Sequence, residues 1–162
     1  MAADTDEAIP EGLNPSEVSV HIAREKALTI EKKFPGKTII AADTIVVLNN
    51  EIIGKPKDRE DAIAILKKLN GAHHQVITGV VIRKNDREIA FHDSTDVQFY
   101  RLSIQELTYY VDKYQPFDKA GAYAIQEWIG VVGIKSIQGD FYNVMGLPVS
   151  RVVRALREFS PS

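Results

Sequence analysis

The segment from Thr38 to Leu48 most strongly constrains the fold, because it is apolar and rich in β-branched residues except for Asp43 and Thr44 near its centre. Such a run indicates one long strand that is buried within a sheet. A carboxylate there is costly unless it is paired, bound to a metal ion or placed at the edge of a cleft. Asp43 is therefore either a hydrogen-bonded structural acid or part of a functional site, and this segment alone leaves both interpretations open.

Capping and turn signals place further elements around this strand. Asn14, Pro15 and Glu17 form the N-terminal signature of a helix that stops at Pro35-Gly36. The turn signal Asn85-Asp86 joins two antiparallel strands. The predicted helices cover residues 15–34, 58–70, 103–114 and the segment after 148. The predicted strands cover residues 38–48, 51–53, 75–83, 88–100 and 129–137. Residues 1–13 are expected to be irregular.

The order of these elements predicts the fold class. Strands and helices alternate, but two antiparallel hairpins interrupt the alternation. We therefore expect an α/β fold whose sheet mixes parallel and antiparallel strands and is flanked by helices. The last helix is expected to turn its apolar residues inward, namely Val149, Val152, Val153, Leu156 and Phe159.

Length and charge exclude several classes of protein. With 162 residues the chain is long enough for one domain with a full core. A net charge of -2 argues against a binder of nucleic-acid polymers, although a few lysines in a cleft can still bind a small anion. No apolar stretch approaches the roughly 20 residues that span a bilayer, no signal peptide is visible and cysteine is absent. We therefore expect a soluble, cytoplasmic protein without a membrane partner.

Two lysines lie in constrained surroundings. Lys55 is held in the turn Gly54-Lys55-Pro56, and Lys119 lies among small residues in Asp118-Lys119-Ala120-Gly121. A lysine ammonium group is a compact charge that suits phosphate oxygens. The alternatives are a solvated turn lysine at position 55 and a surface ion pair at position 119. Together with Asp43, these lysines indicate a site that binds phosphate and needs a base or a metal ligand.

Three other motifs carry weaker signals. Gln126 follows Lys119 by seven residues, so the two side chains would share a face if residues 118–126 were helical. The pair His73-His74 cannot easily bind one metal ion, because adjacent strand residues point to opposite faces, and we expect a structural role for both. The segment Phe141 to Pro148 is interpreted as a packed turn before the last helix.

Taken together and in order, these segments resemble the Maf family of nucleoside triphosphate pyrophosphatases. The resemblance extends from about Glu11 to the C-terminus. The matching blocks are Ala41-Ala42-Asp43-Thr44, Gly54-Lys55-Pro56 with Asp58, Gly71-Ala72-His73 with Thr78-Gly79-Val80, Asp118-Lys119-Ala120-Gly121-Ala122-Tyr123-Ala124-Ile125-Gln126, and Asn143-Val144-Met145-Gly146-Leu147-Pro148.

The resemblance implies an elongated fold like that of inosine triphosphate pyrophosphatases, with residues 1–162 forming a single domain of two lobes around a cleft. It also implies hydrolysis of a nucleoside triphosphate to the monophosphate and pyrophosphate, with a divalent metal cation, Mg or Mn, and a homodimer. Asp43 would be the general base and a metal ligand. Lys55, Lys119 and Lys26 would contact phosphates, while Thr44 and Gln126 match the dTTP/UTP type of family member.

The N-terminus departs from the family pattern. Members open with a strand and a loop that reads approximately Ser-x-Ser-Pro-Arg-Arg, and no such segment precedes the Asn14 signature here. The backbone N–H groups and arginines of that loop should help to hold the triphosphate. We therefore expect either that the sequence is truncated at its N-terminus or that the activity of the protein is impaired by the loss.

Two functions follow from these observations. In the first, the lysines and a divalent cation spread the charge of the triphosphate while Asp43 activates a water molecule. In the second, the cleft binds a nucleotide without turning it over, and the protein is a non-catalytic binding or cell-division regulatory protein. Pyrophosphate release from dTTP or UTP separates the two.

Overall fold

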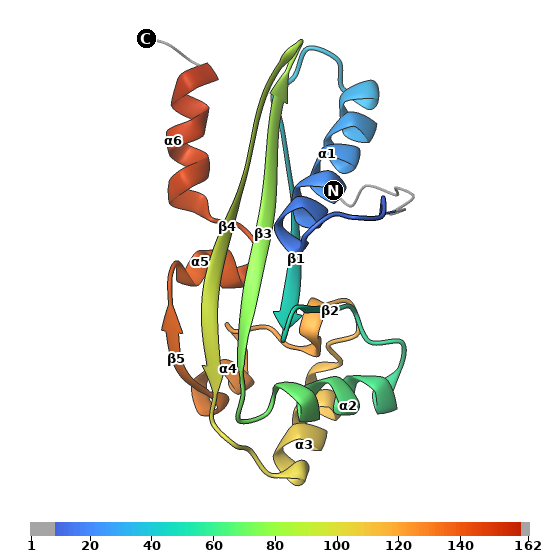
Figure 1. The fold of residues 1–162 in the computed structure, drawn as a ribbon, viewed down its shortest axis with the longest axis vertical. Helices are drawn as coiled ribbons and strands as arrows, with labels where there is room; N and C mark the ends of the chain where they lie inside the picture. The colour runs from blue at the N-terminus through green and yellow to red at the C-terminus, as the bar shows by residue number, and fades with distance from the viewer. Residues whose placement is uncertain (1–8, 160–162) are drawn as a thin grey trace.

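Residues 9–159 are described by a computed structural model, in which long strands form the axis of an elongated molecule (Figure 1). Residues 9–13 contain only a turn, in agreement with the irregular start that the sequence predicts, and residues 1–8 lie outside the described part. The strands are β1 (Ile39–Leu48), β2 (Glu51–Ile53), β3 (His73–Lys84), β4 (Arg87–Phe99) and β5 (Ile134–Gln138). The helices are α1 (Pro15–Lys33), α2 (Arg59–Leu69), α3 (Ile104–Tyr114), α4 (Trp128–Gly133), α5 (Phe141–Met145) and α6 (Val149–Phe159), with a short 3₁₀ helix, η1 (Ala120–Ala122).

The five strands pair in the order β2-β1-β3-β4-β5, and every pairing among the described residues is antiparallel. The prediction of a mixed sheet was therefore wrong, whereas the α/β class is confirmed. The reason lies in the connection through α2. It returns the chain so that β2 and β3 run in the same direction, but the two strands lie on opposite sides of β1 and never become neighbours.

Side-chain caps begin the helices where the sequence predicts them. Asn14 and Glu17 form a reciprocal capping box at α1, and Ser103 and Glu106 form another at α3. Asp58 caps α2 by accepting from the backbone of the first turn. Each cap satisfies backbone N–H groups that a helix start leaves without partners.

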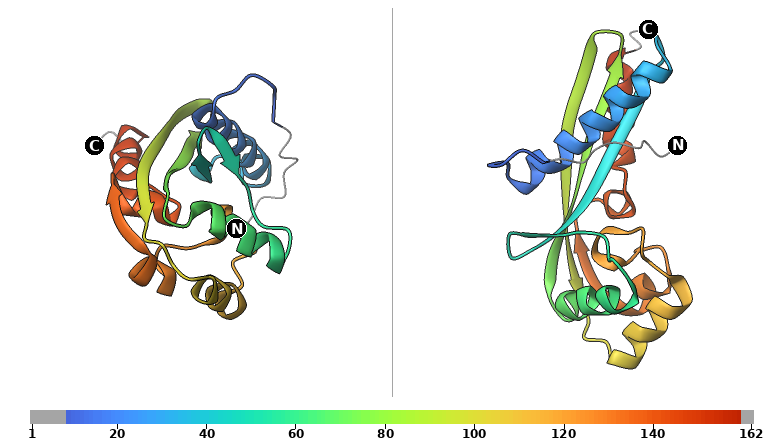
Figure 2. Two further views of the ribbon diagram at one scale, coloured as in Figure 1. Left: turned by 60° about the horizontal axis from the view of Figure 1, so that its bottom comes forward. Right: turned by 90° about the vertical axis from the view of Figure 1, so that its right-hand side faces the viewer.

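Helices α1 and α6 cover opposite faces of the sheet. Val81 packs with Ala23 and Ala27 of α1, whereas its neighbours Val80 and Ile82 pack with α6. Adjacent strand residues point to opposite faces, so this division follows from the pleat of β3. In the right-hand view of Figure 2, α1 lies in front of the strands and the red α6 lies behind them.

Gly79 brings α1 close to the sheet. A Cβ atom at this position would lie 2.4 Å from the backbone carbonyl carbon of Ser19, so only glycine permits this approach. Gly79 is also the cross-strand partner of Asp43. The helix is therefore held against the sheet immediately beside that carboxylate.

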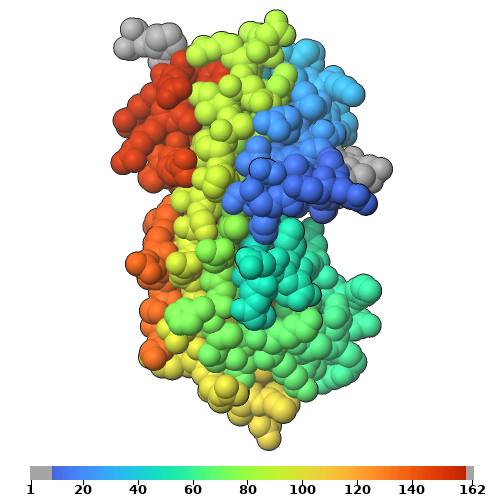
Figure 3. Space-filling model, viewed as in Figure 1, coloured from blue at the N-terminus to red at the C-terminus, as the bar shows by residue number. Residues whose placement is uncertain are grey.

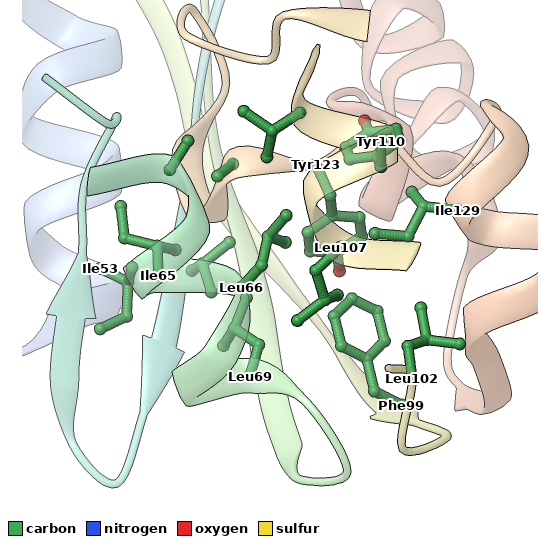
Figure 4. Packing of buried hydrophobic residues seen from close by; sticks show 14 of the residues in the cluster. Ile53, Ile65, Leu66, Leu69, Phe99, Leu102, Leu107, Tyr110, Tyr123 and Ile129 are labelled. Atoms are coloured by element: carbon green, nitrogen blue, oxygen red, sulfur yellow. The ribbon is translucent and has the colours of Figure 1, made fainter. Parts of the chain in front are cut away.

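The main apolar cluster fills the lower half of the molecule in Figure 1. It combines one face of β1, β3 and β4 with α2, α3, η1 and α4 (Figure 4). Its largest fully buried members are Leu66, Leu69, Phe99, Leu107, Tyr110 and Ile129. Figure 3 shows the resulting elongated shape, with α1 and α6 above and the α2–α3 region below.

Three local predictions were wrong. Residues 129–137 do not form one strand, because Trp128–Gly133 is helical and β5 begins only at Ile134. The segment before Pro148 holds a short helix, α5, and not only a turn. Val149 and Val153 of α6 are exposed, while Val152 and Phe159 are buried as expected.

Within residues 9–159, no helix combines the length and the hydropathy that crossing a membrane requires.

Candidate nucleotide-binding site

A pocket opens where β1 passes between the two halves of the molecule. It brings together every site residue that the sequence predicts. Its lining consists of Lys26, Ala42, Asp43, Thr44, Val46, Lys55, Val76, Asp118, Lys119, Ala120, Tyr123, Ala124, Gln126, Val144, Met145 and Gly146.

The sequence of β3 explains why a polar site forms there. Val76 belongs to the main apolar cluster, and Val80 belongs to the cluster beneath α6. Thr78 lies between them on the same face and pairs across the strands with Thr44. A polar layer therefore lies between the two apolar clusters, and it includes part of β1, the strand that carries Asp43.

Asp43 lies on the α1 face of β1 and pairs with Lys26 of α1. Lys26 Nζ donates to Asp43 Oδ1 at 2.9 Å, and both side chains are largely buried. Lys26 follows Ser19 by seven residues, or about two helical turns, so the close approach of α1 at Gly79 directs Lys26 toward the carboxylate. The pair gives the pocket a fixed carboxylate and a fixed cation.

Lys55 and Lys119 reach the pocket from two loops that contact each other. Gly121 N donates to Gly54 O at 3.2 Å, which joins the loop after β2 to the loop of η1. Gly121 has a φ of 73°, and a Cβ atom there would lie 2.8 Å from a methyl group of Val46. Glycine therefore allows the η1 loop to pack on β1 and places both lysines in the lining. Lys119 Nζ also lies 3.5 Å from Asp118 Oδ1, so the predicted neighbour pair is present within the pocket lining.

Thr44 faces the opposite side of β1 from Asp43 and belongs to a buried hydrogen-bond network. Its Oγ1 lies 2.9 Å from Thr78 Oγ1 and 3.4 Å from Gly146 O. Thr78 Oγ1 also lies 3.1 Å from Asn143 O. The Asn143 side-chain nitrogen in turn lies within 3.1 Å of three acceptors, Thr95 Oγ1 and backbone carbonyl oxygens of β3 and β4, which its two protons share. This network attaches α5 and the Met145-Gly146 wall of the pocket to the sheet.

Gln126 reaches the pocket by a route that differs from the prediction. Only residues 120–122 form a short 3₁₀ helix, so Lys119 and Gln126 do not share a helical face. Instead, Tyr110 Oη accepts from Ala124 N at 3.1 Å and lies 2.9 Å from Glu127 Oε1. Burial raises the pKa of Tyr110, so its hydroxyl keeps its proton and acts as the donor to Glu127. These bonds hold the segment around Gln126 at the pocket.

His74 and Tyr123 form a second support beneath this loop. Their Nε2 and Oη atoms share a buried hydrogen bond of 2.6 Å, and both rings pack edge-to-face with Phe99. Burial, with a smaller contribution from His73, lowers the pKa of His74 to about 4. His73 is exposed on the other face of β3. The predicted structural role of His74 agrees with this buried, neutral arrangement.

The pocket holds two carboxylates, Asp43 and Asp118. Within residues 9–159, no cluster of three or more His, Asp or Glu side chains could hold a metal ion by itself. Magnesium is commonly held by one or two carboxylates together with substrate phosphates. The donor set thus suits a cation that arrives with a phosphate ligand.

Sequence reasoning assigned no role to Thr78, Asn143 or Tyr110, which hold the pocket walls. Besides its place in a matching block, Thr78 had a visible signal, because it is a polar residue in an otherwise apolar stretch of β3. The partners of the Asn143 side-chain amide lie at least 48 positions away in the sequence, so no local pattern could reveal them.

Comparisons with known proteins show which family the sequence matches. The sequence profile of a family described as Maf-like protein matches residues 1–159. The chain is 47% identical over 156 residues to the dTTP/UTP pyrophosphatase of Bacteroides thetaiotaomicron, covering 96% of this chain and 81% of that protein. It is 48% identical over 159 residues to the dTTP/UTP pyrophosphatase of Cytophaga hutchinsonii, covering 98% and 73% of the two chains. The dTTP/UTP pyrophosphatase of Bacillus velezensis is 43% identical over 160 residues, which cover 99% of this chain and 84% of that protein.

Proposed function

The chain belongs to the Maf-like protein family, and from this premise we propose that it hydrolyses dTTP or UTP to the nucleoside monophosphate and pyrophosphate. The single observation that carries the proposal is the joint placement of Asp43, Lys26, Lys55 and Lys119 in one pocket. The names of the related pyrophosphatases support the substrate class.

The three lysines supply the charge that a triphosphate needs. They come from α1, from the loop after β2 and from the loop of η1, so they approach the pocket from separate elements. Cations that are already fixed in place can stabilise the charge on phosphate oxygens during the reaction without a cost of reorganisation. We therefore assign phosphate binding to Lys26, Lys55 and Lys119.

Asp43 is suited to the role of general base. Its carboxylate is largely buried and its Oδ1 is oriented by Lys26. In the proposed step a water oxygen bonds to the α-phosphorus, the bond from that phosphorus to the bridging oxygen breaks, and pyrophosphate leaves. Asp43 takes the proton that the water loses, a contribution of typically about 100- to 10,000-fold in rate.

A divalent cation, Mg or Mn, fits this site as a partner of the substrate. A carboxylate has two oxygens that accept several bonds, so the contact with Lys26 is compatible with a metal ion at Asp43. Asp43 would hold the cation, with Asp118 as the second carboxylate of the pocket. When bound, the cation would neutralise charge on the phosphates and on the leaving pyrophosphate.

The uncharged side of the pocket suits the nucleobase of the substrate. Thr44 lies on the face of β1 opposite to Asp43, and Gln126 enters from the loop after η1. A hydroxyl group and an amide can together hydrogen bond to the edge of a pyrimidine. We assign base recognition to these two residues.

A homodimer and a cytoplasmic location complete the proposal. Several apolar side chains of α5 and α6 are exposed, and they supply a surface that a second copy could cover: Phe141, Tyr142, Met145, Val149 and Val153. Light scattering during gel filtration would give the mass in solution. The cytoplasmic location is supported by the absence of cysteine and by the nucleotide substrate.

Product analysis tests the activity. The protein is incubated with dTTP, UTP, CTP or GTP and Mg²⁺, and the products are separated by ion-exchange chromatography. We expect the monophosphate and pyrophosphate from dTTP and UTP. Release of single phosphates would contradict the proposal. Binding of UTP without any hydrolysis would instead support a non-catalytic nucleotide-binding protein.

A further inference from the structure

The hydroxyl groups of Thr44 and Thr78 form a chain that leads from the pocket into the sheet. Thr78 is fully buried, whereas Thr44 lines the pocket. Three contacts connect them to each other and to backbone carbonyl oxygens: Thr44 to Thr78 at 2.9 Å, Thr78 to Asn143 O at 3.1 Å, and Thr44 to Gly146 O at 3.4 Å.

Only two of these three contacts can be hydrogen bonds at one time, because two hydroxyl groups carry two protons and a carbonyl oxygen can only accept. The arrangement that satisfies the two shorter contacts has Thr78 donating to Asn143 O and Thr44 donating to Thr78. The contact between Thr44 and Gly146 O is long for an O–H···O bond and is the one left unmade. In this arrangement the hydroxyl proton of Thr44 is used in the hydrogen bond to Thr78, so the oxygen presents only lone pairs to the pocket.

We propose that Thr78 is a positioning residue that fixes the Thr44 hydroxyl as a hydrogen-bond acceptor and thereby favours uracil and thymine over cytosine. This inference rests on the proposed function, since it assumes that Thr44 faces the base. Uracil and thymine carry an N–H donor at N3, which an acceptor can bind. Cytosine carries a lone pair at N3, which would face the lone pairs of Thr44.

The substitution Thr78→Val tests the proposal. Valine keeps the shape of threonine but removes the group that accepts the Thr44 proton. Asn143 O keeps a donor after the change, because Gly146 N also bonds to it at 3.0 Å. Thr44 then keeps only the long contact with Gly146 O, so its proton can turn toward the ligand and cytosine no longer meets a fixed acceptor.

The measurement is the ratio of affinities for UTP and CTP, obtained by calorimetry in EDTA so that hydrolysis does not interfere. We expect Thr78→Val to lower this ratio about fivefold to tenfold, the size of one hydrogen bond. Thr78→Ser, which keeps the hydroxyl, should restore the wild-type ratio. Thr95→Val is the matched control, because Thr95 also bonds to Asn143, whereas the hydroxyl contacts of Thr44 go to Thr78 and Gly146. It should leave the ratio unchanged even where it lowers stability.

The outcomes separate this inference from the proposed function. An equal ratio in wild type and Thr78→Val would overturn the role of Thr78, whether or not the protein is an enzyme. An equal fall in Thr95→Val would also overturn it, since general loosening would then explain the effect. Failure to release pyrophosphate with Mg²⁺ would remove the proposed activity but leave the affinity ratio as a valid test. Should Thr78→Val not fold, Thr78→Cys supplies a smaller side chain with a weak acceptor, and an unchanged ratio there would count against the proposal.

Discussion

Lys26 donates to Asp43 across 2.9 Å, and this bond links α1 to β1 at the edge of the pocket. Lys26 has two roles in the proposed reaction, because it orients the carboxylate and adds a cation beside the phosphates. Removing one member of a largely buried pair takes a compensating charge away from the other. The pair therefore connects the packing of α1 with the function of the site.

Replacing Lys26 by Met should lower kcat/KM for UTP by at least about tenfold, since an oriented charge pair near the reacting groups is lost. Lys32→Met is the matched control, because Lys32 lies in the last turn of the same helix and is exposed away from the pocket. Steady-state kinetics with UTP check this. Equal losses in the two variants would show that the effect is not specific to the pair with Asp43.

Lys119→Gln should weaken UTP binding about tenfold and UMP binding much less, because the ammonium group is assigned to the phosphate chain. Lys68→Gln on the exposed side of α2 provides a control of the same charge change. Calorimetric titrations at two salt concentrations measure both affinities. A loss that is the same for UTP and UMP would place Lys119 away from the β- and γ-phosphates.

Gly79→Ala should destabilise the fold by about 1–3 kcal/mol, because the added methyl group would clash with the backbone of α1. Gly54→Ala should change stability little, since within residues 9–159 no atom beyond the adjoining residues lies within 4 Å of the added methyl group. Urea unfolding followed by circular dichroism gives both free energies of unfolding. Similar stability in the two variants would contradict the close approach of α1 to β3.

The buried His74 should make stability depend on pH. Burial lowers its pKa from 6.5 to about 4 in the folded state, so below pH 6.5 the unfolded chain binds a proton that the folded protein does not. The contribution of His74 to the free energy of unfolding is fully present above pH 6.5. It falls by roughly 3 kcal/mol as the pH drops to 4.

The comparison of His74→Gln with His73→Gln isolates this contribution. The free energy of unfolding of His74→Gln should fall less steeply than that of wild type between pH 6.5 and 4. His73→Gln should follow the wild-type curve, because His73 is exposed. Parallel curves for all three proteins would show that His74 does not carry a lowered pKa.

Local chemistry made much of the fold predictable. Asn14 and Ser103 mark helix starts because their side chains cap backbone groups only a few residues away. The turn at Asn85 was predictable from the residues that form it, and its φ of 55° is one that asparagine tolerates. Strand direction was not local, because the position of β1 between β2 and β3 depends on packing across the whole sheet.

Some residues that line the pocket could be singled out from the sequence, but the residues that support its walls could not. Asp43 stood out because a carboxylate interrupts an apolar strand, and the lysines stood out from the glycines and proline beside them. The pairing of Lys26 with Asp43 depends on how α1 packs on the sheet, which no spacing in the sequence encodes. The same holds for the contact of Gly121 with Gly54, which sets the η1 loop.

Pyrophosphate release from UTP by wild type and by Asp43→Asn, with Mg²⁺ and equal protein concentrations, tests the proposed hydrolysis most directly. Asparagine keeps the size of the side chain but accepts protons poorly, so the rate should fall at least about 100-fold. Circular dichroism and UTP binding should show that the variant remains folded and still takes the substrate. Equal rates in the two proteins would contradict the role of Asp43 as the base.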